Sequence, residues 1–179
     1  METPSVISVE HSLSPWVNLV EKWVQWPWRE DIEVYHAFRQ ADYVSVLAVD
    51  GSGRIPLVCQ FRPGCGEFTL ELPGGMLEKD ESPETCVRRE LFEEVGCLEG
   101  ELTYLGVLWP DPGRLTNRLH CFFAKGVTVR GAGWEEEHGL ERQLVDSEEF
   151  TKMIRDARLN NAHHLALICL AKSAGLFIY

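Results

Sequence analysis

Runs of apolar residues in the middle of the chain have the lengths and periods of β-strands. Residues 31–38 (DIEVYHAF) alternate apolar and polar side chains, which predicts a half-buried strand. Residues 43–49 (YVSVLAV) form a continuous apolar run, which predicts a buried strand. The turn sequence DGSG follows at 50–53, so residues 55–61 (IPLVCQF) are expected to return as the hairpin partner of that run.

The rest of the chain predicts further strands and helices in mixed order. Strands are expected at residues 68–72, 101–109 and 118–127, and helices at 148–157 and 162–175. The first 30 residues look irregular, because they contain three prolines and four tryptophans without a clear period. Strands interleaved with helices predict an α+β fold, in which helices and a mixed central sheet form an α/β/α sandwich.

The clearest helix is predicted at residues 81–96 (ESPETCVRRELFEEVG). Ser82 is a good N-cap, Pro83 suits the first helical position, and Gly96 is typical of the residue that ends a helix. At 100° per residue, an apolar stripe runs along Val87, Leu91 and Val95.

Three glutamates, Glu90, Glu93 and Glu94, lie beside that stripe within five positions. Taken alone, they would most often be a solvated acidic face, although like charges at this spacing repel by a few tenths of a kcal/mol. Carboxylates at positions i, i+3 and i+4 also present hard oxygen ligands of the kind that Mg²⁺ and Mn²⁺ prefer. Such a cluster is suited to divalent cations that assist attack on a phosphate.

Composition narrows the partners of such a site. The chain has 179 residues, the length of one ordinary domain, and a net charge of −11, which argues against a nucleic-acid-binding surface. An acidic site can still bind a small anion through a cation. The first residues show no basic n-region followed by an apolar h-region, and no apolar run is long enough to span a membrane, so we expect neither a signal peptide nor a transmembrane segment. The six cysteines show no zinc spacing, so we expect free thiols in the cytoplasm.

The glutamates belong to a longer pattern over residues 75–97, GMLEKDESPETCVRRELFEEVGC. It reads G-x5-E-x7-R-E-U-x-E-E-x-G-U, with U apolar, and it resembles the signature of the Nudix hydrolases over its whole length. Cys97 is the loosest match, a small hydrophobe at the last position. The resemblance implies a Nudix fold and a metal-dependent pyrophosphohydrolase.

From about residue 35 to residue 171, the chain is similar to the ADP-ribose pyrophosphatase and nucleotide-sugar branch of that family. The stretches that carry this similarity are VCQFRPG with ELPGG, LWPDPG, NRLHCFFAKG and WEEEHGLERQLVDSEEFTKMI. The strand that ends at Arg62 lacks one basic residue that the branch usually has there, and Cys86-Val87 replaces the usual pair of alanines. These departures concern the choice of substrate more than the reaction.

The resemblance implies the roles of the catalytic and metal-binding residues. Mg²⁺, for which Mn²⁺ can substitute, would be held by Gly74, Glu90, Glu93 and Glu94. Arg89 would pair with a glutamate and orient it. The general base would be Glu137 or its neighbour Glu136, with Glu135 as the remaining candidate and Glu137 preferred.

The same resemblance implies the substrate contacts. Arg62 would bind a phosphate, Glu71 would position the substrate or that arginine, and Pro112 would lie at the substrate. Trp28 is one of three tryptophans that could stack on a base, with packing as the more common role of each. Arg62 and Glu71 could instead be ordinary charges at a sheet edge.

The predicted organisation is an N-terminal strand-rich arm at residues 1–40 and a Nudix hydrolase domain at residues 41–179. Members of the branch usually dimerise through their N-terminal strands, so the resemblance implies a homodimer. The adjacent His163 and His164 are read as a helix surface and its packed neighbour, since neighbouring helical residues point about 100° apart.

The predicted activity is hydrolysis of the pyrophosphate bond in ADP-ribose or a nucleotide sugar, giving a nucleoside monophosphate and a sugar phosphate. The expected partner is thus a small nucleotide, with no nucleic acid and no membrane. Two alternatives stay open: a Nudix hydrolase of a nucleoside triphosphate or dinucleoside polyphosphate, and a sensor that binds a nucleotide sugar without turnover.

Overall fold

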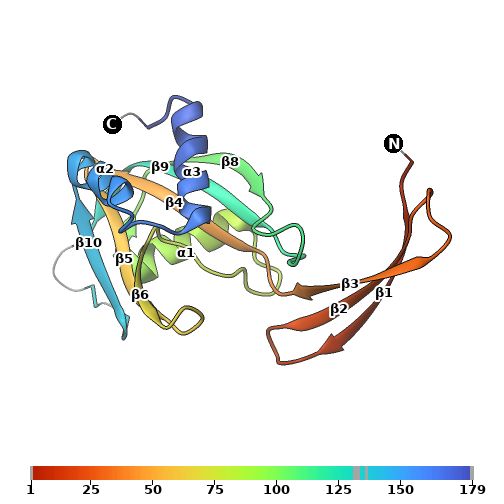
Figure 1. The fold of residues 1–179 in the computed structure, drawn as a ribbon. Coiled ribbons are helices and arrows are strands. Elements are labelled where there is room, and N and C mark those ends of the chain that lie inside the picture. Colours follow the sequence, from red (N-terminus) through yellow and green to blue (C-terminus); the bar gives the residue numbers. More distant parts are fainter. Residues whose placement is uncertain (1, 131–133, 136, 178–179) are drawn as a thin grey trace. The chain divides into compact units, whose positions relative to one another are not determined.

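The structure is a computed structural model that describes residues 2–130, 134–135 and 137–177 of the chain (Figure 1). The chain divides into two compact units. The first comprises residues 1–42 together with 109–118, and the second comprises residues 43–108 and 119–179. The loop 109–118 belongs to the first unit because its backbone pairs with the end of the arm: the Phe38 amide donates to the Arg114 carbonyl, and the Thr116 amide donates to the Phe38 carbonyl.

The first unit is built on a three-stranded antiparallel sheet in the order β1-β2-β3. Its strands are β1 (Ser5–Ser12), β2 (Asn18–Gln25) and β3 (Ile32–Arg39). The expectation of an irregular segment in the first 30 residues was wrong. Pro4, Pro15 and Pro27 all lie outside the strands, so they do not remove any hydrogen bond from the sheet.

The second unit carries the remaining strands in two groups. Its strands are β4 (Tyr43–Asp50), β5 (Ile55–Arg62), β6 (Glu67–Glu71), β7 (Cys97–Leu98), β8 (Glu101–Leu108), β9 (Leu119–Val129) and β10 (Leu140–Val145). One group has the order β10-β5-β6, and in the other β9 pairs with β4, β7 and β8. Because β4 runs parallel to β9 while β7 and β8 run antiparallel to it, the sheet is mixed, as predicted.

The predicted hairpin between β4 and β5 was wrong. The turn exists, and the Asp50 carboxylate closes it by accepting the backbone N–H groups of Ser52 and Arg54 at 2.8 Å each. The two strands then separate: β4 takes β9 as its neighbour, and β5 pairs with β10 and β6. A continuous apolar run is typical of such a strand, since it is buried on both faces whichever partner it has.

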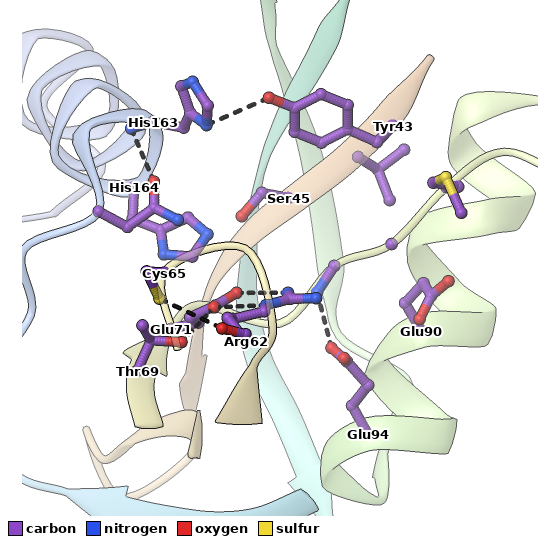
Figure 2. Close-up of a pocket in the computed structure, with 15 residues that line it drawn as sticks. Tyr43, Ser45, Arg62, Cys65, Thr69, Glu71, Glu90, Glu94, His163 and His164 are labelled. Atoms are coloured by element: carbon purple, nitrogen blue, oxygen red, sulfur yellow. Dashed lines mark hydrogen bonds and ion pairs between the residues drawn. The ribbon is translucent and has the colours of Figure 1, made fainter. Parts of the chain in front are cut away.

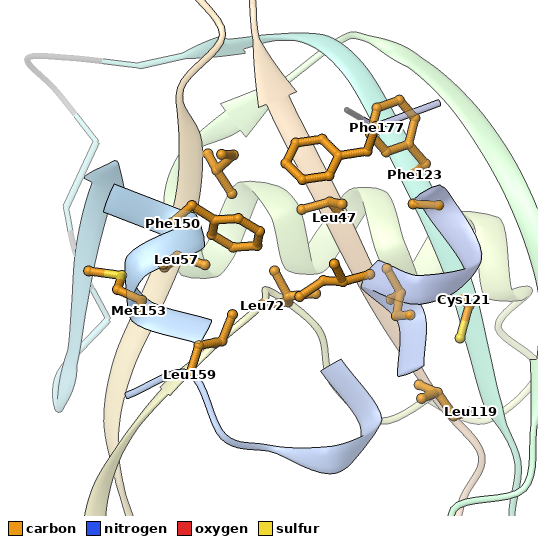
Figure 3. Close-up of a cluster of buried hydrophobic side chains, with 14 residues drawn as sticks. Leu47, Leu57, Leu72, Leu119, Cys121, Phe123, Phe150, Met153, Leu159 and Phe177 are labelled. Atoms are coloured by element: carbon orange, nitrogen blue, oxygen red, sulfur yellow. The ribbon is translucent and has the colours of Figure 1, made fainter. Parts of the chain in front are cut away.

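Helices cover both faces of the sheet. They are α1 (Pro83–Val95), α2 (Ser147–Arg155) and α3 (Ala162–Ser173). Alternate residues of β4 face opposite layers: Val44, Val46 and Ala48 pack in one cluster with the apolar stripe of α1, whereas Leu47 packs in another with α2 and α3 (Figure 3). The α/β/α sandwich predicted from the sequence is therefore confirmed. No helix within the described ranges is long and apolar enough to cross a membrane.

Candidate active site

A cavity of about 510 Å³ opens in the second unit between α1, the β5–β6 hairpin and the start of α3 (Figure 2). Its lining comes from segments far apart in the sequence: Tyr43, Val44, Ser45, Arg62, Cys65, Thr69, Glu71, Gly74, Gly75, Met76, Glu90, Glu94, Asn161, His163 and His164. Three chemically different surfaces meet around it: an acidic wall on α1, an arginine–glutamate pair on β5 and β6, and a wall of neutral polar groups around α3.

The acidic wall is positioned by the way α1 begins and ends. The Ser82 hydroxyl accepts the Thr85 amide at 3.1 Å, and Gly96 ends the helix in the left-handed conformation at φ 63°. Both signals were read from the sequence. The apolar stripe of the helix packs against the sheet, which places the neighbouring Glu90 and Glu94 in a buried position beside the cavity.

The backbone at Gly74 and Gly75 lies directly against these two carboxylates. The Gly74 amide donates to the Glu94 carboxylate at 2.8 Å. A Cβ atom at Gly75 would lie 2.1 Å from Glu90 Oε1, and one at Gly74 would lie 2.2 Å from the Val44 carbonyl oxygen. A side chain at Gly74 would clash with the backbone of β4, whereas a side chain at Gly75 would have to displace the Glu90 carboxylate.

Arg89 holds the acidic cluster from its outer side. Its guanidinium donates to both oxygens of Glu81 at 3.0 Å each, to Glu90 at 2.8 Å and to Glu93 at 3.0 Å. The hydrogen bonds from Arg89 hold the pKa of Glu81 at about 2. Arg89 therefore ties the loop before α1 to the helix and fixes the orientation of the Glu90 carboxylate.

Burial keeps the two inner carboxylates from ionising easily. It raises the pKa of Glu90 above its usual range, and it raises the pKa of Glu94 to about 8 despite the hydrogen bond from Gly74. A positive charge placed in the cavity would reverse this effect, because it favours the ionised form of both groups.

Arg62 and Glu71 form the second surface. The guanidinium donates two hydrogen bonds to the Glu71 carboxylate, at 2.7 and 2.6 Å, and the Thr69 hydroxyl donates a third at 2.6 Å. Burial acts to raise the pKa of Glu71, but these hydrogen bonds outweigh it and hold the pKa below its usual value. Glu71 thus holds the Arg62 guanidinium in one orientation at the cavity.

The third surface was missed by the sequence analysis. The Tyr43 hydroxyl lies 3.1 Å from His163 Nδ1, the Leu72 amide donates to His164 Nδ1 at 3.2 Å, and the Asn161 side chain caps α3. His163 and His164 were read as a helix surface and a packed neighbour, but both line the cavity. The nearest available signal was their position in the first turn of a helix, directly after an N-cap asparagine.

Other predicted residues lie away from this cavity. Glu93, Glu135 and Glu137 line a second hollow of about 440 Å³ with Phe92 and Trp134. Glu136 lies outside the residues that the structure describes.

Pro112 and Trp28 both belong to the first unit, where Trp28 stacks on Trp26 with ring centroids 4.9 Å apart. Trp134 is packed against the end of α1, since its ring nitrogen donates to the Phe92 carbonyl at 2.9 Å. Within the described ranges, no three His, Cys, Asp or Glu side chains converge so that they could hold a metal ion by themselves.

Comparison with known proteins places this site in a family. The model of the NUDIX domain matches residues 39–167, which is most of the chain. The chain belongs to the Nudix family. The matched range contains the cavity and the whole of α1, and members of the family generally use divalent metal ions.

Curated relatives confirm the predicted branch of the Nudix family. The chain is 34% identical over 121 residues to the ADP-ribose pyrophosphatase of Bacillus subtilis (strain 168), covering 66% of this chain and 65% of that protein. It is 32% identical over 155 residues to the GDP-mannose pyrophosphatase of Pectobacterium atrosepticum, covering 81% of this chain and 80% of that protein. It is also 28% identical over 123 residues to the methanol dehydrogenase activator of Bacillus methanolicus, covering 68% of this chain and 66% of that protein. The chain thus spans slightly less than two thirds of the two Bacillus proteins.

One solved structure shares its fold with nearly all of this chain. A crystal structure described as an ADP compounds hydrolase superposes with a TM-score of 0.79, covering 99% of this chain and 98% of that one. The sequence identity is 18%, so this likeness concerns the fold.

Proposed function

We propose that this Nudix protein hydrolyses the pyrophosphate bond of a nucleoside diphosphate linked to a sugar, such as ADP-ribose or a nucleotide sugar. The products are a nucleoside monophosphate and a sugar phosphate. The observation that carries the proposal is the pairing, around one cavity, of two buried carboxylates on α1 with the Arg62–Glu71 pair on β5 and β6. Arg62 would place positive charge on one side of a diphosphate, and a divalent cation held by the carboxylates would place it on the other.

The donor set fits Mg²⁺ or Mn²⁺. Glu90, Glu94 and the backbone of Gly74 offer hard oxygen atoms at the cavity, and burial disfavours the charge of both carboxylates unless a cation is near. With only two side-chain ligands, most coordination positions of such an ion would be filled by water and phosphate oxygens, as is usual for magnesium. When bound, the ion supplies neutralisation of the diphosphate and a more acidic water.

The chain's own residues orient the substrate and accept the proton. Arg62 binds a phosphate oxygen while Glu71 holds its guanidinium in place. Arg89 keeps the Glu90 carboxylate turned toward the cavity. The proton of the attacking water passes to Glu135, Glu136 or Glu137, with Glu137 as the first candidate. Glu137 and Glu93 line the same second hollow. If Glu93 binds a metal ion, that ion would lie between this hollow and the cavity and would bring Glu137 near the reacting water.

A substrate panel tests this proposal. The protein is incubated with Mg²⁺ and ADP-ribose, GDP-mannose, a nucleoside triphosphate or a dinucleoside polyphosphate, and release of nucleoside monophosphate is measured. Turnover of a sugar-linked diphosphate that stops on chelation with EDTA supports the proposal. Preference for the triphosphate or the dinucleoside compound contradicts the substrate class, and tight binding without release contradicts the reaction.

We also propose that the active form is a homodimer joined through one face of the N-terminal sheet. Strand register aligns Ile7, Trp23 and Val34 in one row across the three strands, and all three side chains are exposed in the single chain. Val9 and Ile32 extend this apolar face along the strands. A second copy that presents the same row would bury it by two-fold symmetry.

Adjacent positions on β1 provide a matched test of the dimer. Ile7→Lys places a charge on the apolar face, whereas Val6→Lys places it on the opposite face of the same strand. Size-exclusion chromatography with light scattering should show monomers for Ile7→Lys and dimers for Val6→Lys and the wild type. A wild type that is monomeric at micromolar concentration contradicts the proposal.

The proposed compartment is the cytoplasm. All six cysteines, Cys59, Cys65, Cys86, Cys97, Cys121 and Cys169, are free thiols in the structure, which agrees with a reducing environment.

A further inference from the structure

The hydrogen bond at His164 determines which of its ring nitrogens carries the proton. The Leu72 backbone N–H donates to Nδ1 at 3.2 Å, so Nδ1 must be an acceptor. A neutral imidazole with an accepting Nδ1 carries its hydrogen on Nε2. The ring is buried, and burial lowers the pKa of His164 to about 4, so this neutral form prevails at neutral pH.

The Nε2–H of His164 is left as a donor without a partner inside the protein. Among the residues that the structure describes, it makes no hydrogen bond, and it is not one of the fully buried side-chain atoms that lack a partner, so it is accessible from the cavity. The ring lines the cavity, and Figure 2 shows it pointing from α3 toward the Arg62–Glu71 pair. A donor that faces a cavity is available to a bound ligand, and a ligand that displaces water there without offering an acceptor would cost about 1–3 kcal/mol. A ligand in the cavity would satisfy it.

The neighbouring groups indicate what kind of ligand atom belongs there. The cavity around His164 is lined by the Arg62–Glu71 ion pair, whose charges offset each other, and by uncharged polar side chains: Tyr43, Ser45, Thr69, Asn161 and His163. Hydroxyl, amide and imidazole groups match the hydroxyl oxygens of a sugar, whereas a phosphate is better matched by the guanidinium of Arg62.

We propose that His164 is a specificity-determining residue whose Nε2–H donates to a hydroxyl oxygen of the sugar outside the nucleoside, so that the wall around it is the sugar subsite. This inference rests on the proposed function, because it assumes that the diphosphate lies between α1 and Arg62. It makes the sugar, and not only the diphosphate, part of what the cavity recognises.

Two substitutions at one position separate the two ring nitrogens. In His164→Asn, the amide oxygen can replace Nδ1 as the acceptor for Leu72, but nothing reaches the position of Nε2. In His164→Gln, the longer amide can place a donor near that position. His120→Asn is the matched control, since His120 lies on β9 beside Tyr104 and does not line the cavity.

The substrates are ADP-ribose and the methyl ester of ADP, which keeps the nucleoside and both phosphates but lacks the sugar. His164→Asn should lower kcat/KM for ADP-ribose about tenfold, mainly through KM, because one hydrogen bond to the bound sugar is lost. The methyl ester should be cleaved as fast as by the wild type, and His164→Gln should recover part of the loss. An equal loss with both substrates, or no loss with ADP-ribose, overturns the sugar subsite.

A binding measurement separates failure of this inference from failure of the proposed reaction. Calorimetry with an ADP-ribose analogue that has a methylene bridge between its phosphates needs no turnover. If the wild type releases no product but binds the analogue, and His164→Asn weakens binding about tenfold while His120→Asn does not, the subsite stands and only the reaction is refuted. If the wild type does not bind the analogue, both proposals are overturned.

Discussion

Burial drives groups on both opposite walls of the cavity toward their uncharged forms, but the two walls would bind different parts of a ligand. On α1, burial raises the pKa of Glu94 to about 8, and on α3 it lowers the pKa of His164 to about 4, so each group is driven toward its uncharged form. Glu94 and Glu90 together would accept a cation and then regain their charge. His164 can act in its neutral form, because its Nε2–H can donate a hydrogen bond to an uncharged acceptor. The difference suggests that one wall recognises the metal and the diphosphate while the other recognises the sugar.

The largest expected effect comes from removing charge on the acidic wall. Glu94→Gln keeps the shape of the side chain and an acceptor for the Gly74 amide, but it loses the carboxylate that would face the metal. We expect kcat/KM to fall about a thousandfold, with the fold retained. The control is Glu84→Gln, an exposed glutamate in the first turn of the same helix. A comparable loss in Glu93→Gln would extend the site to the second hollow.

A second readout for Glu94→Gln does not depend on activity. Added Mg²⁺ should raise the melting temperature of the wild type, because a ligand that binds the folded state stabilises it, and should leave that of Glu94→Gln nearly unchanged. Near-normal turnover together with a normal response to Mg²⁺ would show that the acidic wall is not the metal site.

His164, on the neutral wall, should make the free energy of unfolding depend on pH. The folded pKa of His164 is about 4 against 6.5 for an unperturbed histidine, lowered by burial and by His163 and Arg62, with Glu71 acting in the opposite direction. Between these two values the unfolded chain binds more protons, so stability falls as the pH drops from 6.5 to 4. The loss attributable to this group is on the order of 3 kcal/mol.

Urea unfolding at pH 7 and at pH 4.5 measures this effect. His164→Asn should lose less stability between the two pH values than the wild type does, whereas His120→Asn should behave like the wild type. Equal losses in all three proteins would mean that His164 is already charged or exposed in the folded state.

A smaller effect is expected where the loop meets the acidic wall. A methyl group at Gly75 would lie 2.1 Å from Glu90 Oε1, so Gly75→Ala must displace that carboxylate. We expect kcat/KM to fall on the order of tenfold to a hundredfold, since a misplaced catalytic group costs activity even when the fold is kept. Gly51→Ala is the control, because nothing lies within 4 Å of the added atom. Full activity in Gly75→Ala would show that the position of Glu90 is not critical.

The acidic wall could be predicted from the sequence, and the neutral wall could not. Glu90 and Glu94 lie on one helix, and nearby residues in the sequence determine where that helix starts, where it ends and which side is apolar. Their spacing of four residues then places both carboxylates on one side of it. Tyr43, Asn161 and His164 come from β4 and from the start of α3. Their meeting depends on how α3 packs across the sheet, which no local pattern encodes.

The same division explains the errors in the fold. The strands themselves were predictable from their apolar periods, but the partner of β4 was not, because a strand buried on both faces accepts a parallel neighbour as readily as a hairpin. The positions of the strands within the arm were obscured by its prolines and tryptophans, although Val20 and Val24, which are buried, lie on one face of β2.

Arg62 lies where the two walls meet, and a conservative change there tests which wall it serves. Arg62→Lys keeps the charge but loses the two-pronged contact with Glu71, so we expect KM to rise about tenfold with little change in kcat. Arg54→Lys is the control, because Arg54 makes a similar contact with Asp50 at the distant β4–β5 turn. If Arg62 binds the diphosphate, ADP-ribose and the methyl ester of ADP should lose equally. A loss confined to ADP-ribose would instead assign Arg62 to the sugar wall, and the division between the two walls would have to be redrawn.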